Sequence, residues 1–354
     1  MTLRITQIML ARGFGGAERH FVDLSLELAD AGHAVQAICH REFEQRAVLE
    51  DHPNIRVVGA RVWASWDRPA KAAIWRAMER FAPQVIHAHL ARGALFAGFR
   101  APARGIPVVV NTHNYVDMKY YRQVSRFMTA TDDQRRYLMD NGIPGERIDV
   151  IPHFTRLAAV DHVRSTLGPE PVFVSYGRFV HKKGFDVLLE AFARYAAEGG
   201  RGSLVIGGSG PEQPALDALR QQLGLAERVR FAGWVSDVGA FLDSGDVFVL
   251  PSRDEPFGIV VLEAMARGLP MICTRTQGPR EILDSDTAHL VAIGDVLQLS
   301  AALLECERAP ATVLGRALSS LIRFRQQYAA ACVLPKIVDS YEAALRGTRQ
   351  ASAS

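Results

Sequence analysis

Short apolar runs alternate with amphipathic stretches along the whole chain. In the first half, an apolar run at residues 3–10 precedes a glycine-containing loop and an amphipathic segment at 17–31. Phe21, Leu24 and Leu28 recur in that segment at helical spacing, so the pattern predicts a buried strand followed by a helix. This order is the opening of a parallel α/β sheet, in which ligands bind beyond the carboxyl ends of the strands.

The same alternation continues to the end of the chain. Further strands are predicted where apolar runs recur, at residues 34–39, 85–88, 107–110, 172–176, 204–207, 229–231, 247–250 and 270–274. Helices are predicted where the spacing is helical, at residues 71–81, 185–197, 237–242 and from 296 onward. The pattern therefore predicts an α/β protein with two doubly wound, Rossmann-like domains that face a central cleft.

The chain length supports two domains of comparable size. At 354 residues the chain exceeds a typical single domain. We assign residues 1–155 to the first domain and 168–325 to the second, with a weakly patterned link between them. Residues 326–347 are expected to form a terminal helix, which either packs on the second domain or crosses back to the first.

Composition narrows the class of protein. Hydrophobic residues make up 48% of the chain, and the net charge of +3 is too small to indicate binding to nucleic acid. The four cysteines are scattered without metal-binding spacing, which predicts buried thiols in a reducing compartment and no zinc site. The N-terminal run is broken by polar residues, and no segment has the roughly 18 apolar residues of a membrane span. We therefore expect a cytoplasmic protein, soluble or attached to a membrane face.

The segment at 251–267 carries the most specific chemistry. It follows a predicted strand and reads P-S-R-D-E-P-F-G-I-V-V-L-E-A-M-A-R. Glu255 precedes a proline that keeps it out of helical geometry. A helix then starts at Phe257 and Gly258, where free backbone N–H groups favour an anion, and Glu263 lies about one turn further in. The spacing fits a nucleotide-sugar site, and it fits a surface helix with two solvated carboxylates equally well.

The string E-P-F-G-I-V-V-L-E-A-M-A closely resembles the E-x7-E signature of retaining glycosyltransferases of the GT-B class, in particular family 4. The resemblance spans nearly the whole chain, with its sharpest motifs in the second half. It implies a donor site in the second domain, an acceptor site in the first, and a terminal helix that crosses back to the first domain. Glu255 is then expected at the sugar hydroxyls and Glu263 at the ribose. The backbone at Phe257, Gly258 and Ile259 is expected at the sugar or phosphate of the donor.

A cationic loop, G-R-F-V-H-K-K-G-F-D, follows the strand predicted at 172–176. Arg178 and Lys183 stand where cations would meet a diphosphate, because arginine offers a bidentate fork and lysine a point charge. Alone, such a loop is more often only solvated. Together with Glu255 and Glu263, it resembles the arginine and lysine pair with which the family stabilises the departing nucleoside diphosphate. On this basis no metal and no other cofactor is expected.

Two glycine loops also resemble the family. The string G-G-A-E, with Gly15 and Gly16, is similar to the early loop that lies beside the donor phosphates. The string G-S-G-P-E contains Gly208 and resembles the glycine turn near the nucleotide, and the backbone near Val235 is expected to meet the base. In both loops the glycines alone fit a tight turn equally well.

Three histidines stand at the ends of predicted strands. His113 lies in N-T-H-N-Y, where a histidine without other context more often has a structural role. It resembles the histidine that the family places against the sugar donor, so we assign it to the donor site. His87 and His89 alternate on one strand and share a face, but no third ligand is evident, so we reject a metal site.

Cations and aromatic residues are interleaved between Lys119 and Phe127. Aromatic rings sit at the headgroup level of a membrane, and cations are attracted to its anionic surface. The segment therefore predicts peripheral contact with the inner membrane, as in family members that act on lipid-linked acceptors. The alternative is a solvated helix face.

The predicted function is transfer of a hexose or N-acetylhexosamine, with retention, from a UDP-linked nucleotide sugar. The resemblance implies a cell-envelope glycan or a lipid-linked acceptor, such as the lipopolysaccharide core. Three alternatives stay open: a glycoside hydrolase, which also needs two carboxylates, a nucleotide-sugar epimerase of related architecture, and a non-catalytic nucleotide-binding protein.

Overall fold

The computed structural model describes residues 2–13, 15–115 and 117–353, with side chains up to residue 349. Contacts divide the chain into two compact units. The first comprises Met1–Phe154 and Ala330–Ser354, and the second comprises Thr155–Ala329.

The described strands form two sheets in which every pairing is parallel. The first sheet contains β1 (Arg4–Met9), β2 (Ala34–His40), β3 (Ile55–Ala60), β4 (Val85–His89), β5 (Val108–Asn111), β6 (Arg126–Thr129) and β7 (Ile148–Val150). The second contains β8 (Val172–Tyr176), β9 (Ser203–Gly207), β10 (Val229–Gly233), β11 (Val247–Leu250), β12 (Met271–Thr274) and β13 (His289–Val291).

Helices connect the strands in both units. The α-helices are α1 (Gly16–Asp30), α2 (Arg46–Glu50), α3 (Arg68–Phe81), α4 (Leu90–Ala97), α5 (Asp132–Asp140), α6 (Phe185–Ala197), α7 (Gln213–Gln222), α8 (Val238–Asp243), α9 (Ile259–Ala266), α10 (Pro279–Ile282), α11 (Val296–Arg308), α12 (Pro310–Arg323) and α13 (Ala330–Ala353). The shorter turns are η1 (Pro102–Arg104), η2 (Met118–Tyr120), η3 (Gly145–Arg147), η4 (His181–Lys183) and the π-helix η5 (Phe324–Tyr328).

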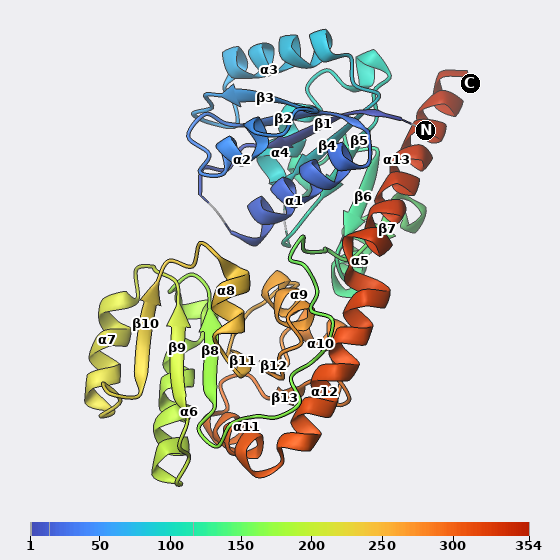
Figure 1. The fold of residues 1–354 in the computed structure, drawn as a ribbon. Helices are drawn as coiled ribbons and strands as arrows, with labels where there is room; N and C mark the ends of the chain where they lie inside the picture. Colours follow the sequence, from blue (N-terminus) through green and yellow to red (C-terminus); the bar gives the residue numbers. More distant parts are fainter. Residues whose placement is uncertain (1, 14, 116, 354) are drawn as a thin grey trace. The chain divides into compact units, whose positions relative to one another are not determined.

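The first sheet has the order β3-β2-β1-β4-β5-β6-β7 and is covered on both faces. Because successive side chains of a strand point to opposite faces, Ile5 and Met9 join the core beneath α1 and α13, and Ile8 joins the core beneath α3 and α4. In Figure 1, α3 lies above this sheet and α1 below it.

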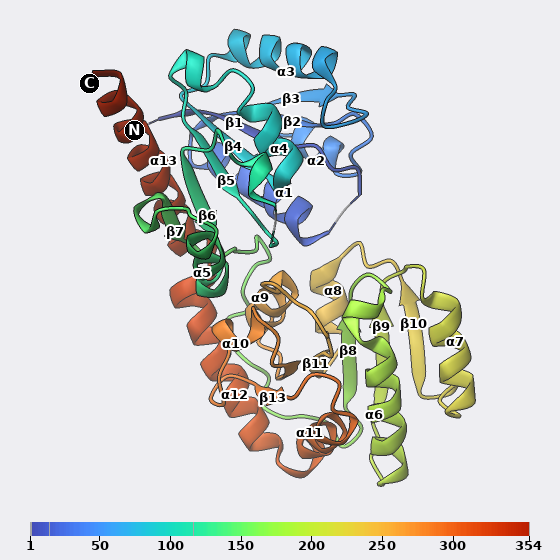
Figure 2. The ribbon, with the colours of Figure 1, turned by 180° about the vertical axis from the view of Figure 1, so that it is seen from behind.

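The second sheet has the order β10-β9-β8-β11-β12-β13. Apolar side chains of α6, α7, α11 and α12 join one core with those of the strands, and Figure 2 shows α6 alongside β8 and β9. The strand order reverses between β8 and β11, the kind of position at which open α/β sheets bind ligands. Both sheets are thus doubly wound, which confirms the predicted fold class.

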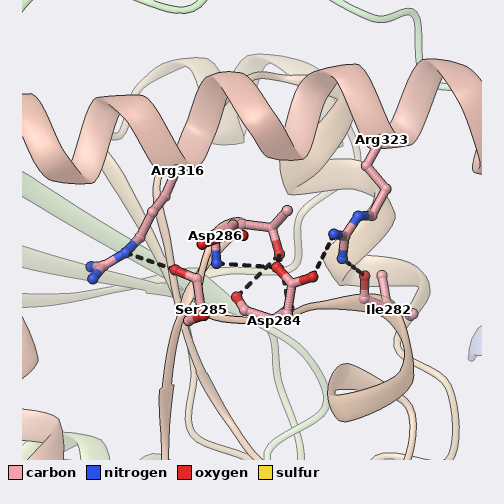
Figure 3. A network of polar contacts seen from close by, with 7 residues as sticks. Ile282, Asp284, Ser285, Asp286, Arg316 and Arg323 are labelled. Atoms are coloured by element: carbon pink, nitrogen blue, oxygen red, sulfur yellow. Dashed lines mark hydrogen bonds and ion pairs between the residues drawn. The ribbon is translucent and has the colours of Figure 1, made fainter.

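Two arginines of α12 fix the loop that follows α10 (Figure 3). Arg316 and Arg323 lie about two helical turns apart, so they project from the same side of the helix. Arg316 donates to the carbonyl of Ser285 at 3.1 Å. Arg323 donates to the carbonyl of Ile282 at 3.0 Å and to the carboxylate of Asp284 at 2.5 Å. These bonds hold α10 and its loop against the helical layer.

Two predicted boundaries differ from the structure. The last helix begins at Ala330 rather than at 326, because η5 ends at Tyr328 and Ala329 has an extended backbone with φ −64° and ψ 145°. The segment expected to link the domains packs in the second unit, where Val160 N donates to the carbonyl of Ala266 at 2.9 Å. The structure also adds short elements that the apolar pattern did not predict: α2, β3, α4, β6, α5, α7 and β13.

Within the described residues, no helix combines the length and the apolar character needed to cross a membrane.

We expect Ile337→Ala to destabilise the first unit by about 2–5 kcal/mol, because Ile337 of α13 is 1% exposed in the core beneath α1. Lys336→Ala, one residue away and exposed, is the matched control and should change the free energy of unfolding by less than about 0.5 kcal/mol. Urea unfolding followed by tryptophan fluorescence measures this in a Trp234→Phe background, which removes the tryptophan of the second unit. An unchanged urea midpoint would show that α13 does not complete this core.

Candidate active site

Two predicted site residues meet at the point where the strand order of the second sheet reverses. β8 and β11 are neighbours, so the loops that leave their carboxyl ends emerge side by side. The Nζ atom of Lys183 lies 2.5 Å from Oε2 of Glu255, with the two side chains only 15% and 13% exposed. The cationic loop and the acidic loop therefore converge, as the sequence predicted.

Close backbone contact holds these two loops together. Gly184 has φ +65°, and a Cβ atom there would lie 2.2 Å from the carbonyl oxygen of Pro251. Arg253 donates two bonds of 2.6 Å to the carboxylate of Asp186, and its backbone N–H donates to the carbonyl of Lys182 at 2.8 Å. Glycine at 184 thus permits the approach, and a bidentate ion pair secures it.

Helix α9 starts beside this ion pair. Gly258 has φ 97° and ψ 65° and offers no side-chain cap to the amides of Ile259 and Val260, whereas Val261 N donates to the carbonyl of Gly258 at 2.9 Å. Phe257 and Ile259 are 5% and 8% exposed and pack inward. Gly278 N donates to the carbonyl of Glu255 at 2.9 Å, which fixes the loop from the other side.

Glu263 lies on the inner side of α9. It is 3% exposed and accepts a hydrogen bond from the hydroxyl of Tyr176, the last residue of β8. Sequence reasoning named Glu263 but missed Tyr176, which carried no motif. The contact places a buried carboxylate next to the strand that leads into the cationic loop.

Arg178 lies two residues after the end of that strand. Its side chain is exposed and makes no hydrogen bond or ion pair with the residues that the structure describes. A guanidinium in this position is available for an anionic ligand.

The neighbouring loops pack tightly around the end of β8. Gly208 has φ +132°, and a Cβ atom there would lie 1.9 Å from the carbonyl oxygen of Gly177. Val235 packs against Gly207. A Cβ atom on Gly207 would lie 2.3 Å from Cγ2 of Val235. Packing alone therefore accounts for glycine at 207 and 208, and Val235 lies beside them.

The early glycine loop lies in the first unit, after β1. Gly15 precedes α1 and accepts from Arg19 N at 2.8 Å. A Cβ atom at Gly16 would meet no described atom within 4 Å, so packing does not require glycine there. Residue 14 of this predicted loop lies outside the described residues.

Five histidine rings form one buried cluster in the first unit. The ring centroids of His87 and His89 are 4.6 Å apart, and those of His89 and His113 are 5.4 Å apart. His20 of α1 and His153 lie 4.1 Å apart, and both contact His113. Sequence reasoning did not assign His153 to this site, and His20 shares the buried face of α1 with its apolar stripe.

His113 differs from the rest of this cluster. Its φ of 61° lies in the left-handed region, which residues other than glycine rarely adopt. Its side chain is 9% exposed, whereas the other four rings are 4% exposed or less. Strained backbone of this kind gathers at functional sites.

A chain of hydrogen bonds runs from α13 to His113. Gln7 donates through Nε2 to the hydroxyl of Tyr341 at 3.1 Å and accepts through Oε1 from Nε2 of His89 at 2.7 Å. Because His89 uses its Nε2 proton in this bond, its Nδ1 accepts from Nε2 of His113 at 3.1 Å. His113 thus keeps an unprotonated Nδ1, which is a hydrogen-bond acceptor for a hydroxyl group.

Tyr341 supports a second branch of the same network. Its hydroxyl donates to Nδ1 of His87 at 2.6 Å, and Nε2 of His87 donates to Oδ1 of Asn111 at 2.6 Å. Both ring nitrogens of His87 are therefore engaged in this network.

Burial keeps the five rings neutral. It lowers the pKa of His87 and of His153 to about 3. Burial, with a smaller contribution from neighbouring histidines, lowers the pKa of His20, His89 and His113 well below the usual value. Across the described chain, no group of three or more His, Cys, Asp or Glu side chains is placed to hold a metal ion.

The predicted membrane-facing stripe does not form one surface. Tyr121 and Phe127 are 2% and 0% exposed in the core of the first unit. Arg126 makes bonds of 2.5 and 2.7 Å with the carboxylate of Asp149. The prediction that Lys119–Phe127 presents its aromatic rings to a membrane is wrong, because the segment folds as a turn and a strand rather than as one helix.

We expect the first unit to lose stability as the pH falls from 7.5 to 5.5. In the unfolded chain His87 and His153 have the usual pKa of about 6.5, whereas in the folded protein their pKa is about 3. Below pH 6.5 protons therefore bind the unfolded state preferentially, and the free energy of unfolding decreases as the pH falls. Each such ring costs about 1.4 kcal/mol of unfolding free energy per pH unit. Urea unfolding at several pH values measures the slope.

His153→Phe should reduce that slope by one proton, because a buried ring that must stay neutral is removed. His162→Asn, which replaces an exposed histidine, is the control and should leave the slope unchanged. A urea midpoint that does not depend on pH in this range would contradict the buried cluster.

Known proteins resemble the chain over both units. The family model for glycosyl transferases group 1 matches residues 161–312, and the model for glycosyltransferase family 4 matches residues 14–158. The lipopolysaccharide core biosynthesis glycosyltransferase LpsE of Rhizobium meliloti (strain 1021) is 35% identical over 79% of this chain and 82% of the relative. LpsD, a lipopolysaccharide core biosynthesis glycosyltransferase of the same strain, is 32% identical over 84% of this chain and 86% of the relative.

A solved structure shares the fold. Anabaena Alr3699/HepE in complex with UDP and glucose matches with a TM-score of 0.83 at 18% identity, over 96% of this chain and 99% of that chain. Fold, sequence relatives and the converging loops agree, and the chain belongs to the GT-B glycosyltransferases of family 4, glycosyl transferases group 1.

Proposed function

We propose that this protein is a retaining glycosyltransferase that moves a hexose or N-acetylhexosamine from a UDP-sugar to the lipopolysaccharide core or another cell-envelope glycan. The observation that carries the proposal is the meeting of Lys183 and Glu255 beside the open start of α9. The ammonium of Lys183, which we assign to the diphosphate, lies 2.5 Å from the carboxylate of Glu255, which we assign to the sugar hydroxyls.

The choice of donor and acceptor has separate support. UDP and glucose are bound in Alr3699/HepE, which shares this fold. The relatives LpsE and LpsD are named for lipopolysaccharide core biosynthesis. Such an acceptor is assembled on a membrane, so we place the enzyme at the cytoplasmic face of the inner membrane.

In the proposed reaction, the bond from the anomeric carbon to the diphosphate oxygen breaks as the bond to the acceptor oxygen forms on the same face. The incoming diphosphate competes with Glu255 for the ammonium of Lys183, which leaves the carboxylate to accept from the sugar hydroxyls. Lys183 and Arg178 then neutralise the charge that grows on the leaving group. The acceptor hydroxyl proton passes to the diphosphate, so the step needs neither a protein nucleophile nor a metal.

The remaining residues are proposed to orient the substrates. Glu263 binds the ribose, and the amides at Phe257, Gly258 and Ile259 bind the sugar or phosphate. His113 accepts a hydrogen bond from a substrate hydroxyl through Nδ1, as its bond to His89 requires.

The glycine loops are proposed to contact the donor. Gly208 and Val235 lie beside the nucleotide, and Gly15 and Gly16 let the donor phosphates approach the backbone.

UDP-sugars should raise the melting temperature of the purified protein, and GDP- and ADP-sugars should not. Binding to the folded state alone adds about 2.7 kcal/mol at a ligand concentration of 100 times Kd. A thermal-shift panel of the three nucleotide classes measures this. If no nucleotide sugar shifts the melting temperature, the proposed donor site is wrong. If a nucleotide sugar binds and altered free sugar is released without acceptor, the protein is an epimerase rather than a transferase.

Arg178→Ala and Lys183→Ala should each lower kcat by about 100-fold or more, because each removes a charge that stabilises the leaving diphosphate. Lys182→Ala, an exposed lysine next to Lys183, is the matched control and should keep its activity. Steady-state kinetics of UDP release with acceptor present gives kcat, and the melting temperature of each variant checks its fold. Unchanged turnover in Arg178→Ala would contradict the mechanism.

A further inference from the structure

The loop between β3 and α3 exposes two tryptophans. Trp63 and Trp66 are 66% and 79% exposed, whereas Trp75 in α3 is fully buried. Two large aromatic side chains exposed this close together indicate a surface that meets a partner. We call residues 61–67 the tryptophan loop.

Cations accompany these rings. The guanidinium of Arg61 lies 4.5 Å from the centre of the Trp63 ring. Arg68 follows the loop at the start of α3 and is exposed. The ammonium of Lys71, one turn on, lies 5.8 Å from the centre of the Phe99 ring, which is itself 45% exposed. Aromatic and cationic groups therefore share the surface around the start of α3.

The acidic groups nearby already have partners. Asp67 accepts from the first turn of α3 at 3.0 Å and from Trp63 N at 3.2 Å. Glu79 lies 2.7 Å from Arg104 and 3.7 Å from Arg100. These two acidic residues compare with five cationic ones around α3: Arg61, Arg68, Lys71, Arg100 and Arg104.

Further cations lie near the end of α4. A Cβ atom at Gly98 would lie 2.6 Å from Cβ of Gln123, so this end of α4 touches the segment after η2. Lys119, Arg122 and Arg147 line a cavity of about 460 Å³ together with Asp117, whose carboxylate lies 2.5 Å from Nζ of Lys119. The first unit thus offers phosphate groups a recess with three cations against one carboxylate, as well as exposed indole rings.

We propose that the tryptophan loop docks the first unit on an anionic lipid surface. Indole rings sit at the level of the lipid headgroups, and cations beside them are attracted to anionic headgroups. A second copy of this chain fits less well, because a symmetric contact would bring the same positive charges together. The proposal moves the membrane contact away from Tyr121 and Phe127, which are buried.

Vesicle binding of the full chain tests the proposal without any need for turnover. The protein should co-sediment with vesicles that contain phosphatidylglycerol and much less with pure phosphatidylcholine, and added salt should weaken binding. Trp63→Ala/Trp66→Ala should lower the affinity for the anionic vesicles at least about tenfold. Trp234→Ala, which removes a 56% exposed tryptophan from the second unit, is the matched control and should bind like the wild type.

The readouts separate this proposal from the proposed function. Trp63→Ala/Trp66→Ala should keep the melting temperature and the donor-induced thermal shift of the wild type, because both side chains are exposed and belong to the first unit, outside the donor loops. Brominated lipids should quench the fluorescence of a Trp234→Phe protein through Trp63 and Trp66. Equal vesicle binding by the double variant overturns the proposal. The proposal is also overturned if the wild type is a dimer, the double variant is a monomer, and both bind vesicles equally, because the tryptophan loop would then join two copies of the chain.

Discussion

The ion pair between Lys183 and Glu255 depends on two loops whose backbones touch. Gly184, at φ +65°, lets the loop after β8 approach Pro251, where any side chain would collide with the carbonyl oxygen. Gly278 does the same beside Phe257, where a Cβ atom would lie 1.9 Å from the carbonyl oxygen. With the backbone held in this way, the opposite charges are in position before a ligand arrives, so little reorganisation remains for the reaction.

Elements with a long apolar pattern could be predicted from the sequence, because a strand buried on both faces of a parallel sheet leaves a continuous apolar run. The strand that ends at Leu250 is of this kind. Short elements such as α2 and β3 have mixed patterns and were missed. The prediction for residues 119–127 failed for a related reason. The alternating cations and aromatic residues indicated a single exposed face, but Tyr121 and Phe127 are buried in the core.

The charged half of the candidate site could be predicted because its residues lie in two short motifs. Their buried partners could not, because those contacts join distant parts of the chain. Tyr176 reaches Glu263 across 87 positions, and Gln7 reaches His89 across 82. Neither pairing leaves a periodic trace in one sequence. His20 gave only a faint signal, as a polar residue on the buried face of α1.

The first unit is assembled from both ends of the sequence. A ribosome delivers residues 1–154 before the second unit and α13 after it. Until α13 arrives, Gln7 and His87 lack the hydroxyl of Tyr341, and the core beneath α1 lacks Ile337. The second unit is therefore free to fold during translation, whereas the first unit becomes complete only after α13 has left the exit tunnel, and its histidine rings then acquire their final tautomers.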